Sequence, residues 1–249
     1  MTPLRWSDLR YISESPAHYL HNLDNPMVPT AAMRLGSLVH ALVLGVAPNS
    51  FIVYEGQRRG NAWKEFKEEH SQVEIVTSDE WERACRCADA VKADPICGPL
   101  LQSGLKEHRL EWEVAGRKCA GTPDLNGDIL VDLKVTQMAN PTRLPWHARK
   151  MMWHGQVAWY SDAVETLGGT MDGHYLLAVT PKAPHLCVAY QLTDETLELG
   201  RRLWHSLFER LRTCEESNQY PGYAQDVIPL DIQDDEDLTL TIGGEEVDL

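Results

Sequence analysis

The sequence lacks any long apolar run. None of its 249 residues lie in an uninterrupted apolar stretch near the ~20 residues that span a bilayer. The N-terminus, MTPLRWSDLR, also lacks the apolar core of a secretory signal. We therefore expect a cytoplasmic protein with no membrane segment, and its ordinary hydrophobic content of 43% favours a globular fold.

A metal-binding or disulfide pattern of cysteines is also missing. The sequence has no CxxC pair and no Cys/His spacing of a zinc ribbon. We interpret the six cysteines as reduced thiols that pack as small hydrophobic side chains. They are Cys85, Cys87, Cys97, Cys119, Cys187 and Cys214.

Basic residues are scarce: 23 Lys and Arg face 37 Asp and Glu, for a net charge of -14. Such a balance disfavours binding to a polyanion. From Asp226 onward, however, there are nine acids and no Lys or Arg. We therefore predict a single domain at 1–223 and an acidic tail at 224–249. Such a tail is typical either of a disordered, solvated segment or of a contact for a basic partner.

Periodicity predicts helices in the first part of the chain, 1–105, with one helix from Ser7 to His21 and another over 30–44. Alternating short segments at 108–116, 117–125 and 129–135 predict antiparallel strands. Two helices, two strands and a final helix follow up to about residue 217. The order predicts an α/β (α+β) fold in which helices flank a central mixed sheet, with the core at 106–217.

The segment ILVDLKV places two opposite charges on one face of an apolar strand. Because strand side chains alternate, Asp132 and Lys134 point the same way. A tight turn at 126–128 joins this strand to Asp124, so a hairpin can bring the two carboxylates together. Two such carboxylates repel each other unless a cation lies between them, and Mg²⁺ prefers carboxylate oxygens. Lys134 beside that cation could orient or deprotonate water, whereas the alternative is a solvated ion pair.

These residues resemble the PD-(D/E)xK nuclease superfamily. Pro123-Asp124 and Asp132-Leu133-Lys134 match its motif. Gly36 to His40 is similar to the GxxxH motif of the RecB-like branch, and Gln156 to Tyr160 is similar to its QxxxY motif. The resemblance implies a restriction-endonuclease-like core preceded by a helical segment, with Gln156 and Tyr160 contacting DNA or supporting Lys134.

An acid on the strand before Asp124 completes this pattern. Glu111 and Glu113 both qualify and share one face of that strand. We favour Glu111, and the choice between the two stays open.

The N-terminal segment and the motifs together resemble RecE-type and lambda-exonuclease-like phage enzymes. The resemblance implies Mg²⁺ or Mn²⁺, as two ions, one of them held by His40, Asp124, Asp132 and the Leu133 carbonyl. Glu111 would serve the second ion. An iron-sulfur cluster is not expected, because only Cys187 and Cys214 lie beyond the motif.

The same resemblance implies a 5′→3′ exonuclease that acts on double-stranded DNA ends during recombination. It further implies a ring-shaped homo-oligomer and a single-strand annealing protein as partner. Arg5, Arg10 and Arg34 are candidates for binding a terminal phosphate or are solubilising charges. Trp153 and Trp159 could stack on a base, although core packing is favoured. The alternatives are a structure-specific or restriction-type endonuclease and an inactive DNA-binding or assembly subunit.

Overall fold

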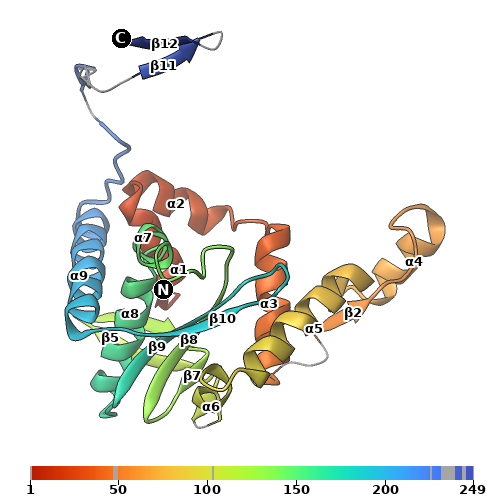
Figure 1. Ribbon diagram of the computed structural model, residues 1–249. Coiled ribbons are helices and arrows are strands. Elements are labelled where there is room, and N and C mark those ends of the chain that lie inside the picture. The colour runs from red at the N-terminus through yellow and green to blue at the C-terminus, as the bar shows by residue number, and fades with distance from the viewer. Residues whose placement is uncertain are drawn as a thin grey trace.

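Two sheets carry the strands of the middle of the chain (Figure 1). This computed structural model describes residues 2–46, 50–102, 104–224, 226–230, 239–242 and 245–248. The helices are α1 (Trp6–Leu9), η1 (Arg10–Ser13), α2 (Pro16–Asp24), α3 (Ala31–Leu44), α4 (Gly60–Glu69), α5 (Ser78–Ala93), α6 (Cys97–Leu100), α7 (Leu144–Lys150), α8 (Trp153–Thr166) and α9 (Asp194–Ser217). The strands are β1 (Leu4–Arg5), β2 (Phe51–Val53), β3 (Glu74–Val76), β4 (Leu105–Lys106), β5 (Leu110–Val114), β6 (Arg117–Gly121), β7 (Leu125–Asn126), β8 (Ile129–Val135), β9 (Gly173–Val179), β10 (Cys187–Gln191), β11 (Thr239–Ile242) and β12 (Glu245–Asp248).

The larger sheet is mixed, as predicted. Its order is β10-β9-β8-β7-β4, and β8 runs parallel to β9 but antiparallel to β7. A second sheet has the order β1-β6-β5, in which β1 is parallel and β5 antiparallel to β6. The predicted α/β architecture with flanking helices is therefore confirmed, with its strands divided between these two sheets.

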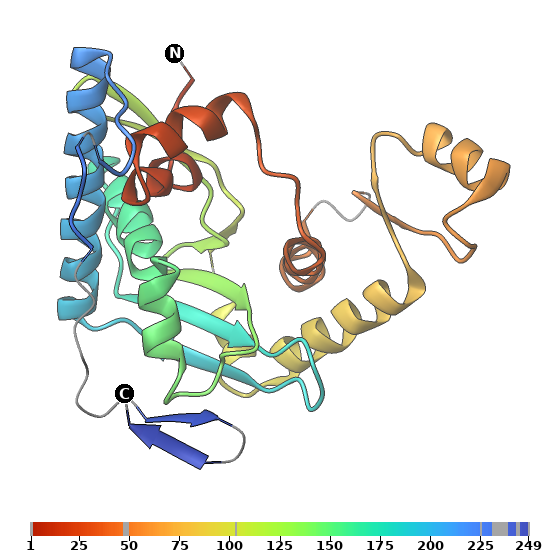
Figure 2. The same ribbon diagram turned by 90° about the horizontal axis from the view of Figure 1, so that it is seen from above.

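The two faces of β8 pack against different helices, as Figure 2 shows from above. Val131 and Leu133 belong to a core formed with α3 and α5. Leu130, on the opposite face, belongs to the core of α8 and α9. By alternation, Asp132 and Lys134 share the face of Leu130, so the charged residues lie on the α8 side of the sheet.

The N-terminal part differs from the expected run of helices. Leu4 and Arg5 form a strand that pairs with Cys119 and Ala120 of β6, which attaches the N-terminus to the second sheet. The predicted helix from Ser7 to His21 is interrupted. Ser15 is extended and its hydroxyl accepts the His18 N–H, which starts α2 anew at Pro16. The interruption follows from Pro16, because proline has no N–H to donate and is suited to the first helical turn.

A projecting arm of β2, α4 and β3 extends from the body beyond α5 (Figure 2). The two strands are parallel, with Ile52 opposite Ile75. Within the arm, the ring of Tyr54 lies 5.1 Å from that of Trp63 and 4.7 Å from that of Phe66. These aromatic contacts hold α4 against the strand pair.

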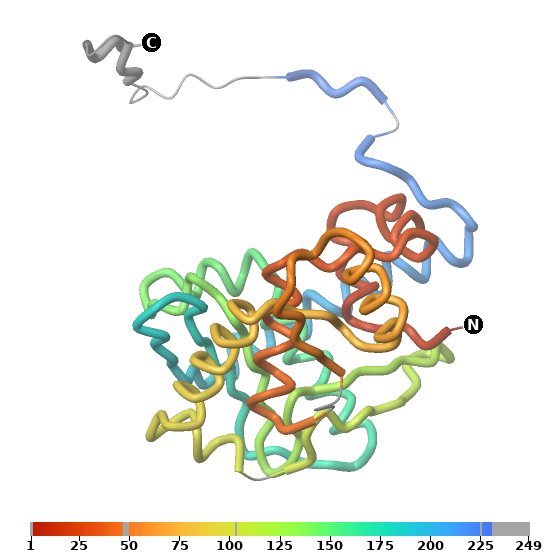
Figure 3. Tube along the Cα trace, turned by 90° about the vertical axis from the view of Figure 1, so that its right-hand side faces the viewer, coloured from red at the N-terminus to blue at the C-terminus, as the bar shows by residue number. Residues whose placement is uncertain are grey.

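Beyond α9 the chain leaves the body, as Figure 3 traces. Tyr223 still contacts the start of α2, since its ring lies 5.4 Å from that of His18 and its hydroxyl donates to Glu14, just before the helix, at 3.0 Å. Val227, Ile228 and Leu230 are exposed. Residues 231–238 of the acidic tail lie outside the described residues, and so does the expectation of disorder for them. Residues 239–242 and 245–248, which belong to the same tail, form the antiparallel strand pair β11 and β12.

No helix in the part of the chain that the structure describes is both long and apolar enough to cross a membrane.

Candidate active site

Asp132 and Lys134 lie side by side on β8, as the strand periodicity predicts. Asp132 is buried, and its Oδ2 lies 2.7 Å from the Lys134 ammonium. Lys134 also donates to Oε1 of Gln156 at 3.0 Å, and Gln156 Nε2 donates to the Tyr160 hydroxyl at 3.2 Å. The two α8 residues are one turn apart, so both reach the sheet. The QxxxY pair therefore fixes the position of the Lys134 ammonium.

Asp124 is buried and lies between α3 and β8. Its Oδ1 is 3.1 Å from Nδ1 of His40, and its Oδ2 accepts the Leu133 N–H at 2.6 Å. His40 is brought there by α3, whose buried Leu38 and Val39 face the core with α5. The GxxxH histidine and the first motif aspartate are thus in direct contact.

The Leu133 carbonyl lies on the side of β8 that faces β7, at a point that β7 leaves unpaired. The ladder between β7 and β8 ends at the pair Leu125 and Val131, so β7 does not reach Leu133. In a strand, the N–H and C=O of one residue point to the same side. Since the Leu133 N–H meets Asp124, its carbonyl oxygen also points toward that carboxylate.

Burial disfavours charge on each of these groups, and their contacts decide the net result. For His40, the Asp124 carboxylate outweighs burial and raises the pKa of the ring. For Asp124, the same contact and the Leu133 N–H outweigh burial and hold the pKa low. For Asp132, burial and the charge of Asp124 outweigh Lys134, so the pKa of its carboxyl is raised. A further cation would therefore stabilise the charged form of Asp132 more than that of Asp124.

Asp132 supplies a specific sign that these donors fit a divalent cation. Its Oδ2 is buried and forms an ion pair with the Lys134 ammonium at 2.7 Å, without a further hydrogen-bond donor. Two carboxylates, a carbonyl oxygen and an imidazole nitrogen suit Mg²⁺ or Mn²⁺. The ligand atoms of His40, Asp124 and Asp132 do not all come within 4.8 Å of one another. Each carboxylate contacts a basic side chain of the protein instead, Asp124 that of His40 and Asp132 that of Lys134.

Glu111, the upstream acid favoured from the sequence, does not reach the other site residues. Glu111 is exposed and pairs with Arg109 at 2.7 Å, on the strand face opposite the buried Trp112. Glu113, the other candidate, is exposed on that same face. Strand alternation sends both acids to solvent because Leu110 and Trp112 fill the core.

Glu107 takes the place beside Asp124 that was expected for Glu111. Its N–H donates to the Asp124 carbonyl at 3.0 Å. Burial and the Asp124 charge raise the pKa of the Glu107 carboxyl. Glu107 also lines a cavity of about 780 Å³ together with His40, Leu133 and Lys134. No pattern marks it in the sequence, because it follows a strand of two residues and has left-handed backbone, with φ of 46°.

Two of the three arginines reach the site. Arg5 and Arg10 line a cavity of about 380 Å³ whose wall also includes Lys134, Gln156 and Tyr160. Gly121 forms another part of this wall, and a Cβ there would lie 2.6 Å from the Tyr160 ring, so only glycine permits this approach.

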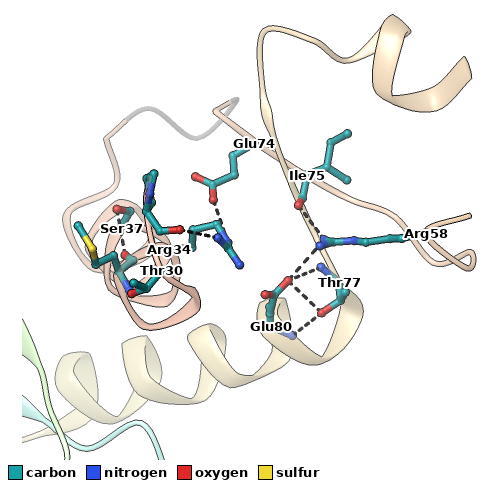
Figure 4. Close-up of polar contacts among 10 residues, drawn as sticks. Thr30, Arg34, Ser37, Arg58, Glu74, Ile75, Thr77 and Glu80 are labelled. Carbon is teal, nitrogen blue, oxygen red and sulfur yellow. Dashed lines mark hydrogen bonds and ion pairs between the residues drawn. The ribbon is translucent and has the colours of Figure 1, made fainter. Parts of the chain in front are cut away.

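Arg34 does not join them. It donates to the Pro29 carbonyl at 2.8 Å and lies 3.7 Å from Glu74 of β3, as Figure 4 shows. Six residues separate Arg34 from His40 along α3, so the two side chains leave the helix in different directions, and that of Arg34 meets β3 of the arm.

The two tryptophans have different surroundings. Trp159 is fully buried among Trp112 and Trp204, and its Nε1 donates to the Ala120 carbonyl at 3.4 Å, so it is a core residue as favoured. Trp153 lines both cavities, and its ring lies 5.8 Å from the Lys134 ammonium. The larger cavity and the arginine cavity therefore meet at Lys134, Met151, Trp153 and Gln156.

Comparisons with known proteins agree with this geometry. A family model described as "PDDEXK-like domain of unknown function (DUF3799)" matches residues 6–228. Among solved structures, the chain is similar to a crystal structure named "putative exonuclease" from Eubacterium rectale, with a TM-score of 0.66 and 16% identity over 93% of this chain and 91% of that one. At this identity the likeness concerns the fold. A search of curated proteins gave no match.

Proposed function

Because the chain belongs to the PDDEXK-like family DUF3799, we propose that it is a metal-dependent deoxyribonuclease that hydrolyses DNA from double-stranded ends. The observation that carries the proposal is the pair of buried carboxylates, Asp124 and Asp132, beside Lys134, in which Asp132 Oδ2 has the Lys134 ammonium at 2.7 Å and no further hydrogen-bond donor. The solved structure of similar fold is named a "putative exonuclease", which supports the choice of class.

His40, Asp124, Asp132 and the Leu133 carbonyl would hold one Mg²⁺ or Mn²⁺, and Glu107 would serve a second. When bound, such ions polarise the scissile phosphate and lower the pKa of bound water. The protein's own groups supply the rest. Lys134 orients the attacking water through its ammonium, which Gln156 holds at 3.0 Å and Tyr160 supports through Gln156.

Arg5 and Arg10 would bind the phosphate at the DNA end. They line the smaller cavity next to Lys134, and a guanidinium can bind a phosphate through two parallel hydrogen bonds. The larger cavity, which shares Trp153 with the smaller one, would take the other part of the strand. The same proposal includes a 5′→3′ direction of digestion. It also includes a ring-shaped homo-oligomer and a single-strand annealing partner in phage-type recombination.

The test compares linear duplex with covalently closed circular duplex in the presence of Mg²⁺. The proposal expects degradation of the linear DNA alone, with mononucleotides released first from a labelled 5′ end. Cleavage of the closed circle would favour the endonuclease alternative. If neither substrate is cleaved with Mg²⁺ or Mn²⁺, the chain would be a DNA-binding subunit of the same fold.

A further inference from the structure

Three potential metal ligands come together away from the catalytic carboxylates. The carboxylate of Asp94 and the sulfurs of Cys97 and Cys187 all lie within 4.8 Å of one another. They come from three places in the chain: the residue after α5, the first residue of α6 and the first residue of β10. In the sequence these cysteines are 90 positions apart, so spacing gives no sign of the cluster.

Local hydrogen bonds hold Asp94 in position. Its Oδ1 accepts the N–H groups of Ile96 and Cys97 at 2.9 and 2.8 Å, which leaves Oδ2 for another partner. The turn itself is tightly packed, since a Cβ at Gly98 would lie 2.5 Å from the Lys92 carbonyl oxygen. The carboxylate is therefore fixed before any ligand binds.

Cys187 approaches from the edge of the larger sheet. It begins β10, the outermost strand, and its Sγ lies 3.6 Å from the Ala90 carbonyl at the end of α5. Cys97 is fully buried, whereas Asp94 and Cys187 are half-buried, so the cluster is shielded on one side and accessible to a cation on the other.

The electrostatic setting also favours a cation. The cluster lies at the C-terminal end of the 16-residue helix α5, where unpaired carbonyls give a negative potential. A bound metal would displace the protons of the two thiols, because a thiolate is the ligand form.

We propose that Asp94, Cys97 and Cys187 form a second metal site, which takes a borderline-soft divalent cation such as Zn²⁺. Two sulfurs and one carboxylate oxygen are a ligand set that Zn²⁺ accepts, with water in the fourth position of a tetrahedron. Mg²⁺, which prefers oxygen ligands, would bind here poorly. The metal would join the turn between α5 and α6 to the edge strand β10 and so stabilise that side of the sheet.

The experiment adds Co²⁺ to the reduced, metal-free full-length protein and records the near-ultraviolet thiolate-to-metal absorption. This band reports sulfur ligands only, so the oxygen and imidazole donors around Asp132 do not contribute. We expect one equivalent of Co²⁺ to produce the band and Zn²⁺ to remove it. Melting of the wild type should also shift upward with Zn²⁺, because a ligand that binds only the folded state stabilises it.

Matched variants make the result specific. Cys97→Ser and Cys187→Ser should lose the band, whereas Cys85→Ser, at a partly exposed cysteine of α5, should keep it. Asp94→Asn retains an oxygen for the Ile96 and Cys97 N–H groups, so it should fold while binding Co²⁺ at least tenfold more weakly. The proposal is wrong if the wild type gives no band, if the band survives in Cys97→Ser or Cys187→Ser, if Asp94→Asn binds as tightly as the wild type, or if mass spectrometry of the untreated protein finds a Cys97–Cys187 disulfide.

Discussion

Glu107 and Glu111 carry the same charge but have different surroundings. Glu107 lines the cavity of His40 and Lys134, whereas Glu111 is paired with Arg109 in solvent. We expect Glu107→Gln to lower the rate of Mg²⁺-dependent hydrolysis by about 10- to 100-fold, the range found when groups that support a metal site are removed. Steady-state kinetics on linear duplex over a range of Mg²⁺ concentrations would measure it.

Glu111→Gln is the matched control and should retain nearly full activity. If Glu111→Gln lowered the rate more than Glu107→Gln, Glu111 of β5 would be the upstream acid instead.

The arginines allow a second test at the scale of single residues. Arg10→Gln should slow digestion of 5′-phosphorylated ends by about 10- to 100-fold, since a hydrogen bond to a charged group contributes about 1.5–3 kcal/mol. Digestion of 5′-hydroxyl ends should change much less. A competition assay that contains both kinds of end measures the ratio of their digestion rates directly.

Arg34→Gln serves as the comparison, because Arg34 is bound to the Pro29 carbonyl and faces Glu74. An equal loss on both kinds of end in Arg10→Gln would argue against a terminal-phosphate contact.

At the scale of elements, α5 depends on its N-terminal cap. Thr77 accepts the Glu80 N–H through its hydroxyl, and Glu80 accepts the Thr77 N–H at 2.8 Å (Figure 4). Thr77→Ala should lower the free energy of unfolding by about 1 kcal/mol, the usual effect of losing such a cap. Urea denaturation measures it, with Ser78→Ala as the neighbouring control.

The contribution of the cap should depend on pH. Burial raises the pKa of Glu80, but the Thr77 hydrogen bonds outweigh it and the net pKa is lowered. A lowered pKa in the folded state means that the stabilisation is present above the unfolded pKa and is lost as pH falls through the folded one. The difference in stability between wild type and Glu80→Gln should therefore decrease below about pH 4. A constant difference from pH 7 to pH 3 would contradict this.

Elements were predicted from the sequence where one periodic pattern dominated. The period-two segment around Asp132 predicted that this carboxylate and Lys134 share a face, and the turn at 126–128 predicted their approach to Asp124. Arg34 was misplaced because helical phase alone does not show that β3 brings Glu74 to that side of α3. Glu107 was missed because a strand of two residues has no detectable alternation.

The pairing of Cys97 with Cys187 was missed for a different reason. It depends on β10 returning beside α5, a contact between segments 90 positions apart. Local patterns carry no information on such distant pairings, and only the packed sheet shows them.

For the whole molecule, we expect the acidic tail to oppose binding to DNA. Residues 231–249 hold eight acids and no basic residue, more than half of the net charge of -14. Deletion of these residues should strengthen binding to duplex in metal-free buffer at low salt, and the gain should diminish as salt screens the charges. Fluorescence anisotropy at about 50 and 200 mM salt would compare the two proteins. Weaker binding by the shortened chain would assign the tail a direct role in DNA contact.

The central claim is that the buried carboxylates beside Lys134 perform metal-dependent hydrolysis. The most direct measurement is the single-turnover rate on end-labelled linear duplex with Mg²⁺, for the wild type and for Asp132→Asn, with melting temperatures to confirm folding. We predict a loss of at least about 100-fold, since metal stabilisation of the transition state is worth several kcal/mol and each ~1.4 kcal/mol is tenfold. A folded Asp132→Asn variant that cleaves within a few-fold of the wild-type rate would contradict the account.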